Sequence, residues 1–143
     1  MKINQISIFI ENTKGRLAEV CSVLGENNIN IRALTIAESP EFGILRVVLD
    51  KPEEAKEILK KNGFIATSAD IVAVEVSDDP GGLAKALKVL ADNNINVQYM
   101  YGFVEKATEK ALMVFKFENI DKAIDVLKSK GINVVDKKTA LGL

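Results

Sequence analysis

The chain has 143 residues, a formal net charge of −1 and no histidine. Apolar residues make up 48% and charged residues 27%, which is the balance of a folded soluble protein and not of a disordered or membrane-spanning one. The small net charge gives no general attraction to nucleic acid or anionic lipid, and without imidazole the usual metal ligand is missing. We therefore expect a protein without metal or cofactor. Residues 1–5 begin no apolar run long enough for a signal peptide or a membrane span, so we expect a cytoplasmic protein with no membrane partner.

The chain contains an internal repeat. Residues 15–31 return as residues 81–97, with identity at nine of the seventeen positions. A second match, between residues 55–63 and 123–131, runs at an offset of sixty-eight instead of sixty-six, so two residues are inserted between the matches. We predict two homologous modules, residues 1–68 and 69–143. Because modules of about 70 residues have marginal cores, we expect them to pack on each other or on a second chain.

The first half reads as strand, helix, two strands, helix and strand. Alternation over residues 6–10 predicts the first strand, and apolar residues at spacings of three and four predict a helix that Thr13 caps and that Asn27-Asn28 end. Strands are predicted at residues 29–36 and 44–49 around a hairpin loop at 39–43. A helix with Pro52 in its first turn and a short strand at residues 64–66 complete the half.

The second half repeats this order. A strand at residues 72–76 leads into a helix with Asp79 as its predicted cap and Pro80 as its first residue, and Asn93-Asn94 end that helix. Strands are predicted at residues 95–104 and 111–117, joined by a loop at 106–110. A helix containing Ile120 to Leu127 and a strand at residues 132–135 follow.

The order strand-helix-strand-strand-helix-strand, found twice, predicts an α+β chain of two ferredoxin-like modules. Each module is expected to be a four-stranded antiparallel sheet with both helices on one face, because the split strand-helix-strand crossovers are right-handed. This fold hosts many unrelated functions, so the fold alone assigns none.

The turn into the first helix of each half is one candidate binding site. In the second half Gly81 and Gly82 leave the backbone uncovered beside a helix N-terminus, and Gly15 does so in the first half. Free amides at a helix N-terminus favour a bound carboxylate. The same residues are equally explained as a helix cap worth about 1 kcal/mol with no ligand.

Asn30 and Asn96 open the second strand of each half and are the other candidates. An asparagine carbonyl can accept a hydrogen bond from an ammonium group, although an asparagine in a turn also commonly satisfies nearby backbone. A site for a carboxylate together with an acceptor for an ammonium is what a free amino acid requires.

These residues resemble the ACT domain, an amino-acid-sensing module. The second half carries its signature as Asp79-Pro80-Gly81-Gly82-Leu83 followed by Asn94-Ile95-Asn96-Val97, whereas the first half has Thr13-Lys14-Gly15 where Asp-Pro-Gly is commonest. The first half is more similar to the ACT domain of acetolactate synthase regulatory small subunits, through Glu11-Asn12, Gly15, Leu17 and Asn30-Ile31. The resemblance covers both halves, so the whole chain is similar to a free-standing tandem ACT protein.

The resemblance implies a non-catalytic sensor that binds an amino acid where two ACT modules meet and acts on a partner enzyme. In the small subunits a turn asparagine, a turn glycine and a strand asparagine contact the effector. The matching residues of this chain are Asn12, Gly15 and Asn30 in the first half and Asp78, Gly81 and Asn96 in the second half. Asp78 adds a negative charge, which would either repel a ligand carboxylate or hold its ammonium group, and we favour the first half as the better candidate. The complete set of candidate ligand-binding residues is Asn12, Thr13, Lys14, Gly15, Arg16, Leu17, Asn30, Ile31, Asp78, Asp79, Gly81, Gly82, Leu83, Asn96 and Val97.

Three other functions compete with this hypothesis. An RNA-binding module has the same element order, and Tyr99, Tyr101 and Phe103 with Phe115 and Phe117 could form a stacking platform. Against it, residues 111–117 lack the basic-glycine-aromatic pattern of the RNA motif. A second alternative is a partner-binding subunit without a ligand. An enzyme is disfavoured, because no nucleophile and base occur together.

The aromatic stripe Tyr99, Tyr101 and Phe103 also bears on assembly. Such a stripe on the open face of a small module is expected to be covered by the other half or by a second chain. We therefore predict a homodimer or larger assembly.

Overall fold

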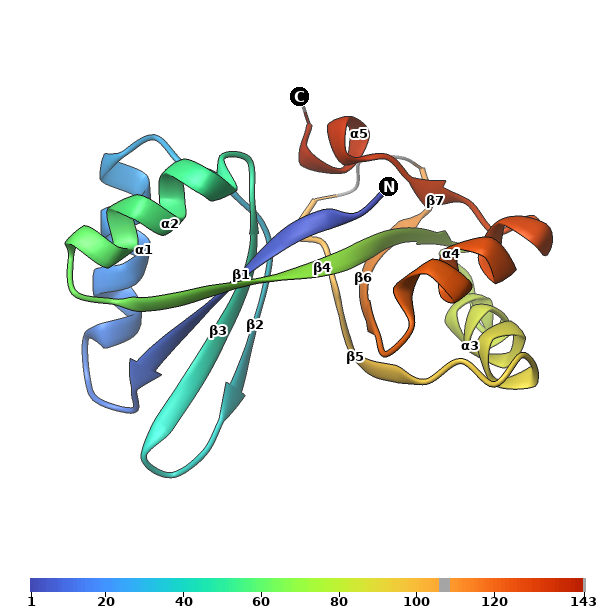
Figure 1. Ribbon diagram of the computed structural model, residues 1–143, viewed down its shortest axis with the longest axis horizontal. Helices are drawn as coiled ribbons and strands as arrows, with labels where there is room; N and C mark the ends of the chain where they lie inside the picture. Colours follow the sequence, from blue (N-terminus) through green and yellow to red (C-terminus); the bar gives the residue numbers. More distant parts are fainter. Residues whose placement is uncertain (106–108, 143) are drawn as a thin grey trace. The chain divides into compact units, whose positions relative to one another are not determined.

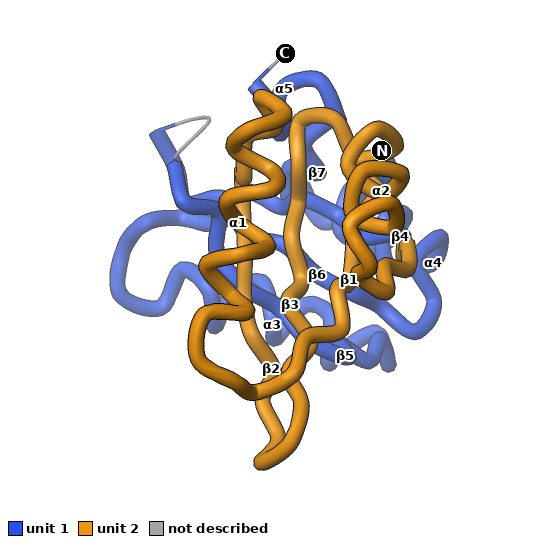
Figure 2. The backbone as a smooth tube through the Cα atoms, turned by 90° about the vertical axis from the view of Figure 1, so that its left-hand side faces the viewer, with its two compact units in different colours: residues 1–3, 70–143 blue, residues 4–69 orange. Residues whose placement is uncertain are grey.

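The computed structural model describes residues 1–105 and 109–142, so the predicted loop at 106–110 lies partly outside the described residues. The chain divides into two compact units, residues 4–69 and residues 1–3 with 70–143. Figure 2 colours the first of these orange and the second blue. We call residues 4–69 the first module and the other unit the second module.

The first module contains a four-stranded sheet and two helices. Its elements are β1 (Ile3–Glu11), α1 (Arg16–Glu26), β2 (Ile31–Glu38), β3 (Phe42–Leu49), α2 (Pro52–Lys61) and the first part of β4 (Ile65–Val76). The strands lie in the order β2-β3-β1-β4, and β3 pairs antiparallel with both β1 and β2. Figure 1 shows α1 and α2 on the same face of this sheet.

Alternation along β1 determines which side chains enter the core of the first module. Ile6, Ile8 and Ile10 lie opposite Val47, Leu45 and Gly43 of β3 and face the helices, where they are buried with Val20 and Leu24 of α1. Ser7 and Phe9 lie on the other face, as the period of two requires.

The second module repeats the arrangement with one addition. Its elements are the rest of β4, then α3 (Gly82–Asp92), β5 (Val97–Gly102), β6 (Ala111–Phe117), α4 (Ile120–Ser129), β7 (Val134–Val135) and α5 (Lys137–Leu141). The strands lie in the order β7-β4-β6-β5 with antiparallel pairing. No helix in the described ranges has the length and apolar content needed to cross a membrane.

The predicted fold class is confirmed, since each module has the strand-helix-strand-strand-helix-strand order and an antiparallel sheet. The predicted helix ends are also confirmed. Asn28 and Asn94, with φ of 57° and 56°, are the two non-glycine residues with positive φ in the described chain. Asparagine tolerates this left-handed conformation, which allows the chain to leave α1 and α3 for the next strand.

Two predictions about the elements are wrong. Residues 64–66 and 72–76 are not separate strands, because β4 runs without interruption from Ile65 to Val76. No glycine or proline occurs between Gly63 and Pro80, so nothing in that stretch breaks an extended chain. The short helix α5 was not predicted, although Asp136 caps it by accepting a hydrogen bond from the Thr139 amide at 2.7 Å.

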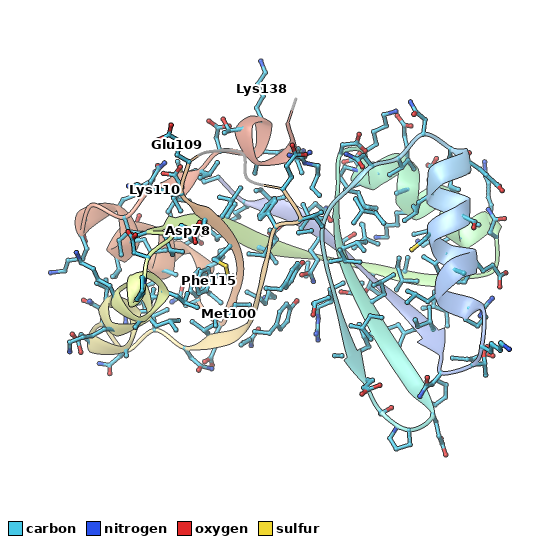
Figure 3. All side chains as sticks on the ribbon, turned by 180° about the vertical axis from the view of Figure 1, so that it is seen from behind. Asp78, Met100, Glu109, Lys110, Phe115 and Lys138 are labelled. Carbon is cyan, nitrogen blue, oxygen red and sulfur yellow. The ribbon has the colours of Figure 1, made fainter. Side chains whose placement is uncertain are left out.

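The predicted aromatic platform also fails in part. Phe115 and Phe117 are 0% and 1% exposed and belong to the core beneath the helices, with Leu90 and Leu127. Figure 3 labels Phe115 among the side chains of the second module. Two rings buried under helices cannot stack on bases, which removes half of the structural argument for RNA binding.

Candidate functional site

The turn between β1 and α1 is built around a left-handed glycine. Gly15 has φ of 89° and occupies the N-cap position, and α1 starts at Arg16 without a side-chain cap. The Thr13 amide donates to the Glu11 carbonyl at 2.8 Å, and the Arg16 amide donates to the Thr13 carbonyl at 3.4 Å. The prediction that Thr13 caps the helix is therefore wrong, because the helix begins two residues later than expected.

This turn forms one wall of a pocket of about 130 Å³, which we call the turn pocket. Its lining residues come from β1, the turn, α1, β2 and β3, and they are Ile10, Glu11, Asn12, Thr13, Leu17, Ile36, Glu38, Phe42 and Gly43. Three of the predicted site residues, Asn12, Thr13 and Leu17, therefore lie together. Lys14 and Gly15 are exposed beside them in the same turn.

Asn12 ties the turn to the β2–β3 hairpin. Its side-chain Nδ2 donates to the carbonyls of Ser39 at 3.5 Å and Pro40 at 3.3 Å, and its backbone amide donates to the Glu41 carbonyl at 3.0 Å. These bonds use the donors of Asn12, so the carbonyl oxygen Oδ1 is the atom that can accept from a ligand.

The charges around the turn pocket suit a zwitterion. Glu11 and Glu38 contribute carboxylates that can pair with an ammonium group. The first amides of α1 have no intrahelical partner and carry partial positive charge, so they favour a carboxylate. A carbon built on Gly15 would meet nothing within 4 Å, so the backbone there is open to approach.

Arg16 points to a different part of the first module. Its guanidinium carbon lies 4.5 Å from the centroid of the Phe64 ring, and its Nη1 pairs with Glu19 Oε2 at 3.0 Å. Arg16 is not among the residues that line the turn pocket. A structural role in covering the end of the core describes it better than ligand binding.

Asn30 and Ile31 lie at the opposite end of α1 from the turn. The eleven residues of α1 span roughly 16 Å at 1.5 Å per residue. The Asn30 amide donates to Asp50 Oδ1 at 2.9 Å, and its carbonyl accepts from the Asp50 amide at 3.2 Å. Asn30 therefore precedes β2 as an exposed residue held by its backbone, and one module does not bring it to the turn pocket.

The second module has the same turn with different side chains. Gly81 occupies the N-cap position of α3 with φ of 85°, without a side-chain cap. Asp79 does not cap α3 and Pro80 is not its first residue, contrary to prediction, because the left-handed glycine delays the helix to Gly82. The Asp79 carboxylate instead accepts from Ser77 Oγ at 2.5 Å.

Gly82 is needed for close packing. A carbon built on it would lie 1.9 Å from the Ser77 carbonyl oxygen, so its backbone is covered by Ser77 and not open as predicted. Leu83 packs against the core of the second module. Asp78 is exposed in the turn between Ser77 and Gly82.

Asn96 and Val97 again lie at the far end of the helix from the turn. Asn96 Nδ2 donates to Glu118 Oε2 at 3.5 Å, and the Glu118 amide donates to the Asn96 carbonyl at 3.3 Å. Asn96 contributes to a separate open pocket of about 560 Å³ with residues 118–122. Both modules thus hold the predicted turn and the predicted asparagine apart.

Sequence reasoning missed the strand residues of the turn pocket. Ile36, Glu38 and Phe42 enter it because β3 pairs with both β1 and β2, with Glu11 opposite Phe42 and Glu38 opposite Gly43. The repeat itself carries no signal for them, since the match ends before the hairpin. The only signal for them in the sequence was the predicted hairpin loop at residues 39–43. Antiparallel pairing of this hairpin with the first strand brings the loop to the end of that strand.

An exposed apolar edge borders the turn pocket. Leu17, Leu34 and Ile36 are 39%, 40% and 43% exposed. Leu34 and Ile36 lie opposite Val47 and Leu45 on the helix side of the sheet, on the outermost strand of the first module. Within the described residues β2 pairs with β3 alone, so its other edge presents backbone groups for pairing.

The chain matches the family described as an ACT domain pair over residues 1–142, so it belongs to that family. A crystal structure of a Bacteroides thetaiotaomicron protein is 40% identical, with a TM-score of 0.93 over 100% of this chain and 98% of that one. The acetolactate synthase small subunit of Buchnera aphidicola is 22% identical over 148 residues, covering 95% of this chain and 92% of that protein.

The fold also occurs in the ligand-free regulatory subunit of aspartate kinase from Thermus thermophilus. That structure is 18% identical, with a TM-score of 0.66 over 90% of each chain. At this identity the likeness concerns the fold. The tandem ACT resemblance and the predicted fold are thereby confirmed.

Proposed function

We propose that this chain is a non-catalytic regulatory protein that binds a free amino acid at the turn pocket of the first module. The observation that carries the proposal is the meeting of three groups in one pocket. Leu17 from the first turn of α1, the carboxylate residues Glu11 and Glu38, and the apolar residue Ile36 all line it. A zwitterion with a small side chain matches all three.

In this proposal each charged end of the ligand has its own partner. The ligand carboxylate takes hydrogen bonds from the α1 amides beside Gly15, where the helix dipole favours negative charge. The ammonium group is held by Glu11, Glu38 and Asn12 Oδ1. In the second module Asp78 replaces Asn12 at the turn and opposes a ligand carboxylate, so we propose the first module as the principal site.

A second copy of the chain would complete the site. Antiparallel pairing of two β2 strands brings the start of each strand beside the end of the other. This pairing would place Asn30 and Ile31 of the second copy next to Glu38 and the turn pocket, and would bury Leu17, Leu34 and Ile36. The separation of Asn30 from Asn12 within one module supports such a two-copy site, which we propose forms a homodimer.

The regulated partner is proposed to be an enzyme of amino-acid metabolism. Membership of the ACT domain pair family and the similarity to an acetolactate synthase small subunit support a role as a subunit or effector of such an enzyme. A subunit that binds its partner without any amino acid is the competing proposal, and the same experiment separates the two.

The test is a thermal-unfolding screen of the common amino acids at millimolar concentration. A ligand at about 100 times its dissociation constant adds about 2.7 kcal/mol. Each kcal/mol raises the midpoint of a chain of this size by roughly 2–4 °C, so one class of amino acid is expected to stand out clearly. Sedimentation of the same samples should show a dimer. A screen without any shift would favour the ligand-free partner subunit.

A further inference from the structure

Gly43 is a buried glycine in a strand that has a neighbour on each side. It lies opposite Ile10 of β1 and opposite Glu38 of β2, so it holds the central position of a row across three strands. Glycine weakens a strand because it has no side chain to pack. Within sheets it commonly marks a bulge, an unusual backbone conformation or a place where another group approaches closely.

The structure excludes the local reasons for a glycine at this position. The register is regular at Gly43 on both sides, so no bulge occurs there. Gly43 is not one of the glycines with positive φ. A β-carbon built on it would lie 3.4 Å from Ile10 Cγ1, 3.7 Å from Ile10 Cδ1 and 3.8 Å from Ile36 Cγ2, which are ordinary contacts with side chains. An alanine would therefore fit both the backbone and the packing.

The missing side chain leaves a hollow in the wall of the turn pocket. In the preceding row the central position is held by Leu45, whose side chain is fully buried. At Gly43 the row has no side chain, and the place of the absent carbon is bordered by Ile10 and Ile36. Both of these residues line the turn pocket, together with Leu17 and Gly43 itself. The hollow thus has aliphatic walls and opens into the proposed amino-acid site.

The internal repeat provides a comparison for this position. Ala111 lies opposite Val76 in the second module as Gly43 lies opposite Ile10 in the first. These pairs correspond at the repeat offsets of sixty-six and sixty-eight. Ala111 packs against the core of the second module. The same place in the fold therefore accepts a methyl group in one module, and lacks it in the module that has the proposed site.

The volume of the turn pocket limits what can enter it. The pocket measures about 130 Å³, which is the liquid volume of about four water molecules at roughly 30 Å³ each. This is room for a side chain of a few carbon atoms and too little for an aromatic ring. The aliphatic walls formed by Ile10, Leu17 and Ile36 favour an apolar side chain, because a polar group placed against them would lose its hydration without gaining a partner.

We propose that Gly43 is the specificity-determining residue of the turn pocket. The side chain of the bound amino acid packs on the bare backbone of Gly43, between Ile10, Leu17 and Ile36. The pocket thereby selects short aliphatic side chains, and the absence of a side chain at Gly43 sets their maximum length. This inference rests on the proposed amino-acid site and adds to it the class of ligand and the residue that selects it.

The test compares the wild type and Gly43→Ala by calorimetric titration of glycine, alanine, 2-aminobutyrate, valine, leucine, phenylalanine and lysine into the full-length protein. The wild type should bind one of the aliphatic members most tightly and should bind phenylalanine and lysine weakly. In Gly43→Ala that best ligand should weaken by roughly tenfold, the lower end of the discrimination produced by one carbon in an apolar pocket. A shorter member of the series should become the tightest ligand.

Two further variants assign the effect to the hollow. Gly102→Ala also adds a methyl group to a strand glycine, in the second module and away from the turn pocket, where the nearest atom would be Met113 Sδ at 3.9 Å. It should leave the order of affinities unchanged. Ile10→Val removes the Cδ1 atom that lies 3.7 Å from the added carbon. Alone it should favour a longer side chain, and combined with Gly43→Ala it should recover most of the lost affinity.

The proposal is overturned if folded Gly43→Ala keeps the wild-type order of affinities, if Gly102→Ala changes that order equally, or if the wild type binds phenylalanine or lysine most tightly. In each of these cases an amino acid still binds, so the proposed function stands while the role of Gly43 fails. Absence of binding by any member of the series to the wild type would overturn both. Circular dichroism of each variant confirms that it is folded.

Discussion

Gly15 and Gly81 hold the same place in the two modules and share a left-handed backbone, with φ of 89° and 85°. Their repetition made the turns visible in the sequence as places where the backbone is uncovered. The sequence could not show that glycine, and not Thr13 or Asp79, would be the N-cap. A polar residue before a glycine is compatible with a helix capped by the polar side chain and with a helix that starts after a left-handed glycine. Only the backbone conformation distinguishes these two turns.

Two other glycines give a prediction at the residue scale. Gly82→Ala places a carbon 1.9 Å from the Ser77 carbonyl oxygen, and such overpacking should destabilise the second module by about 1–3 kcal/mol. Gly25→Ala lies in helix α1 with nothing within 4 Å of the added carbon, and should stabilise by about 0.5–1 kcal/mol. The second module already has Ala91 at that position.

Urea unfolding of the two alanine variants measures both effects, and Gly25→Ala serves as the control for adding a methyl group to a helix. An unchanged midpoint in Gly82→Ala would mean that the close approach of Ser77 is relaxed without cost, against the packing described above.

At the scale of elements, periodicity was sufficient for the helices and most strands, because one buried face fixes the spacing of apolar residues. It failed at β4, where two predicted strands are one, and at α5, which is only five residues long. The turn pocket was half predicted. Asn12, Thr13 and Leu17 follow from the turn, but Ile36, Glu38 and Phe42 depend on strand register, which no local pattern reveals.

Helix α5 gives a prediction about pH. The Thr139 amide donates to the Asp136 carboxylate, and this hydrogen bond, followed by that of the Thr139 side chain, lowers the pKa of Asp136 below its usual value of 3.8. A carboxyl group whose pKa is lower in the folded state than in the unfolded state stabilises the folded state at pH values above its unfolded pKa. That contribution declines as the pH falls below 3.8 and is lost below the folded pKa.

Hydrogen exchange at the Thr139 amide measures this effect. Protection should be constant at neutral pH and fall in the acid range as Asp136 is protonated. Asp136→Asn keeps a capping side chain without a titrating group, so its protection should not depend on this step. Equal acid sensitivity in the wild type and in Asp136→Asn would contradict the assignment.

At the scale of the whole molecule, two copies of one fold have diverged around their helix starts. The first module has a turn pocket bordered by carboxylates and fills the neighbouring region with Arg16 and Phe64. The second module places Asp78 in its turn, where the first module has Asn12, and has Gly82 and Ile132 at the positions of Arg16 and Phe64. Duplication supplies the fold twice, and substitution at a few positions changes the side chains around the first helix of each module.

The central claim is that an amino acid binds beside Gly15, and the two turn glycines allow a matched test. Gly15→Asp and Gly81→Asp impose similar strain, of about 1 kcal/mol, because both positions are left-handed. Neither added carbon meets anything within 4 Å. An aspartate near the ligand carboxylate costs on the order of 4 kcal/mol at about 4 Å in an effective dielectric of ~20, before screening by salt.

The deciding measurement is calorimetric titration of the amino acid selected by the thermal screen into the wild type, Gly15→Asp and Gly81→Asp, with circular dichroism to confirm folding. We expect binding to vanish in Gly15→Asp and to remain within about twofold of the wild type in Gly81→Asp, a difference that strain common to both cannot produce. Undiminished affinity in folded Gly15→Asp would contradict the account and place the ligand elsewhere on the protein.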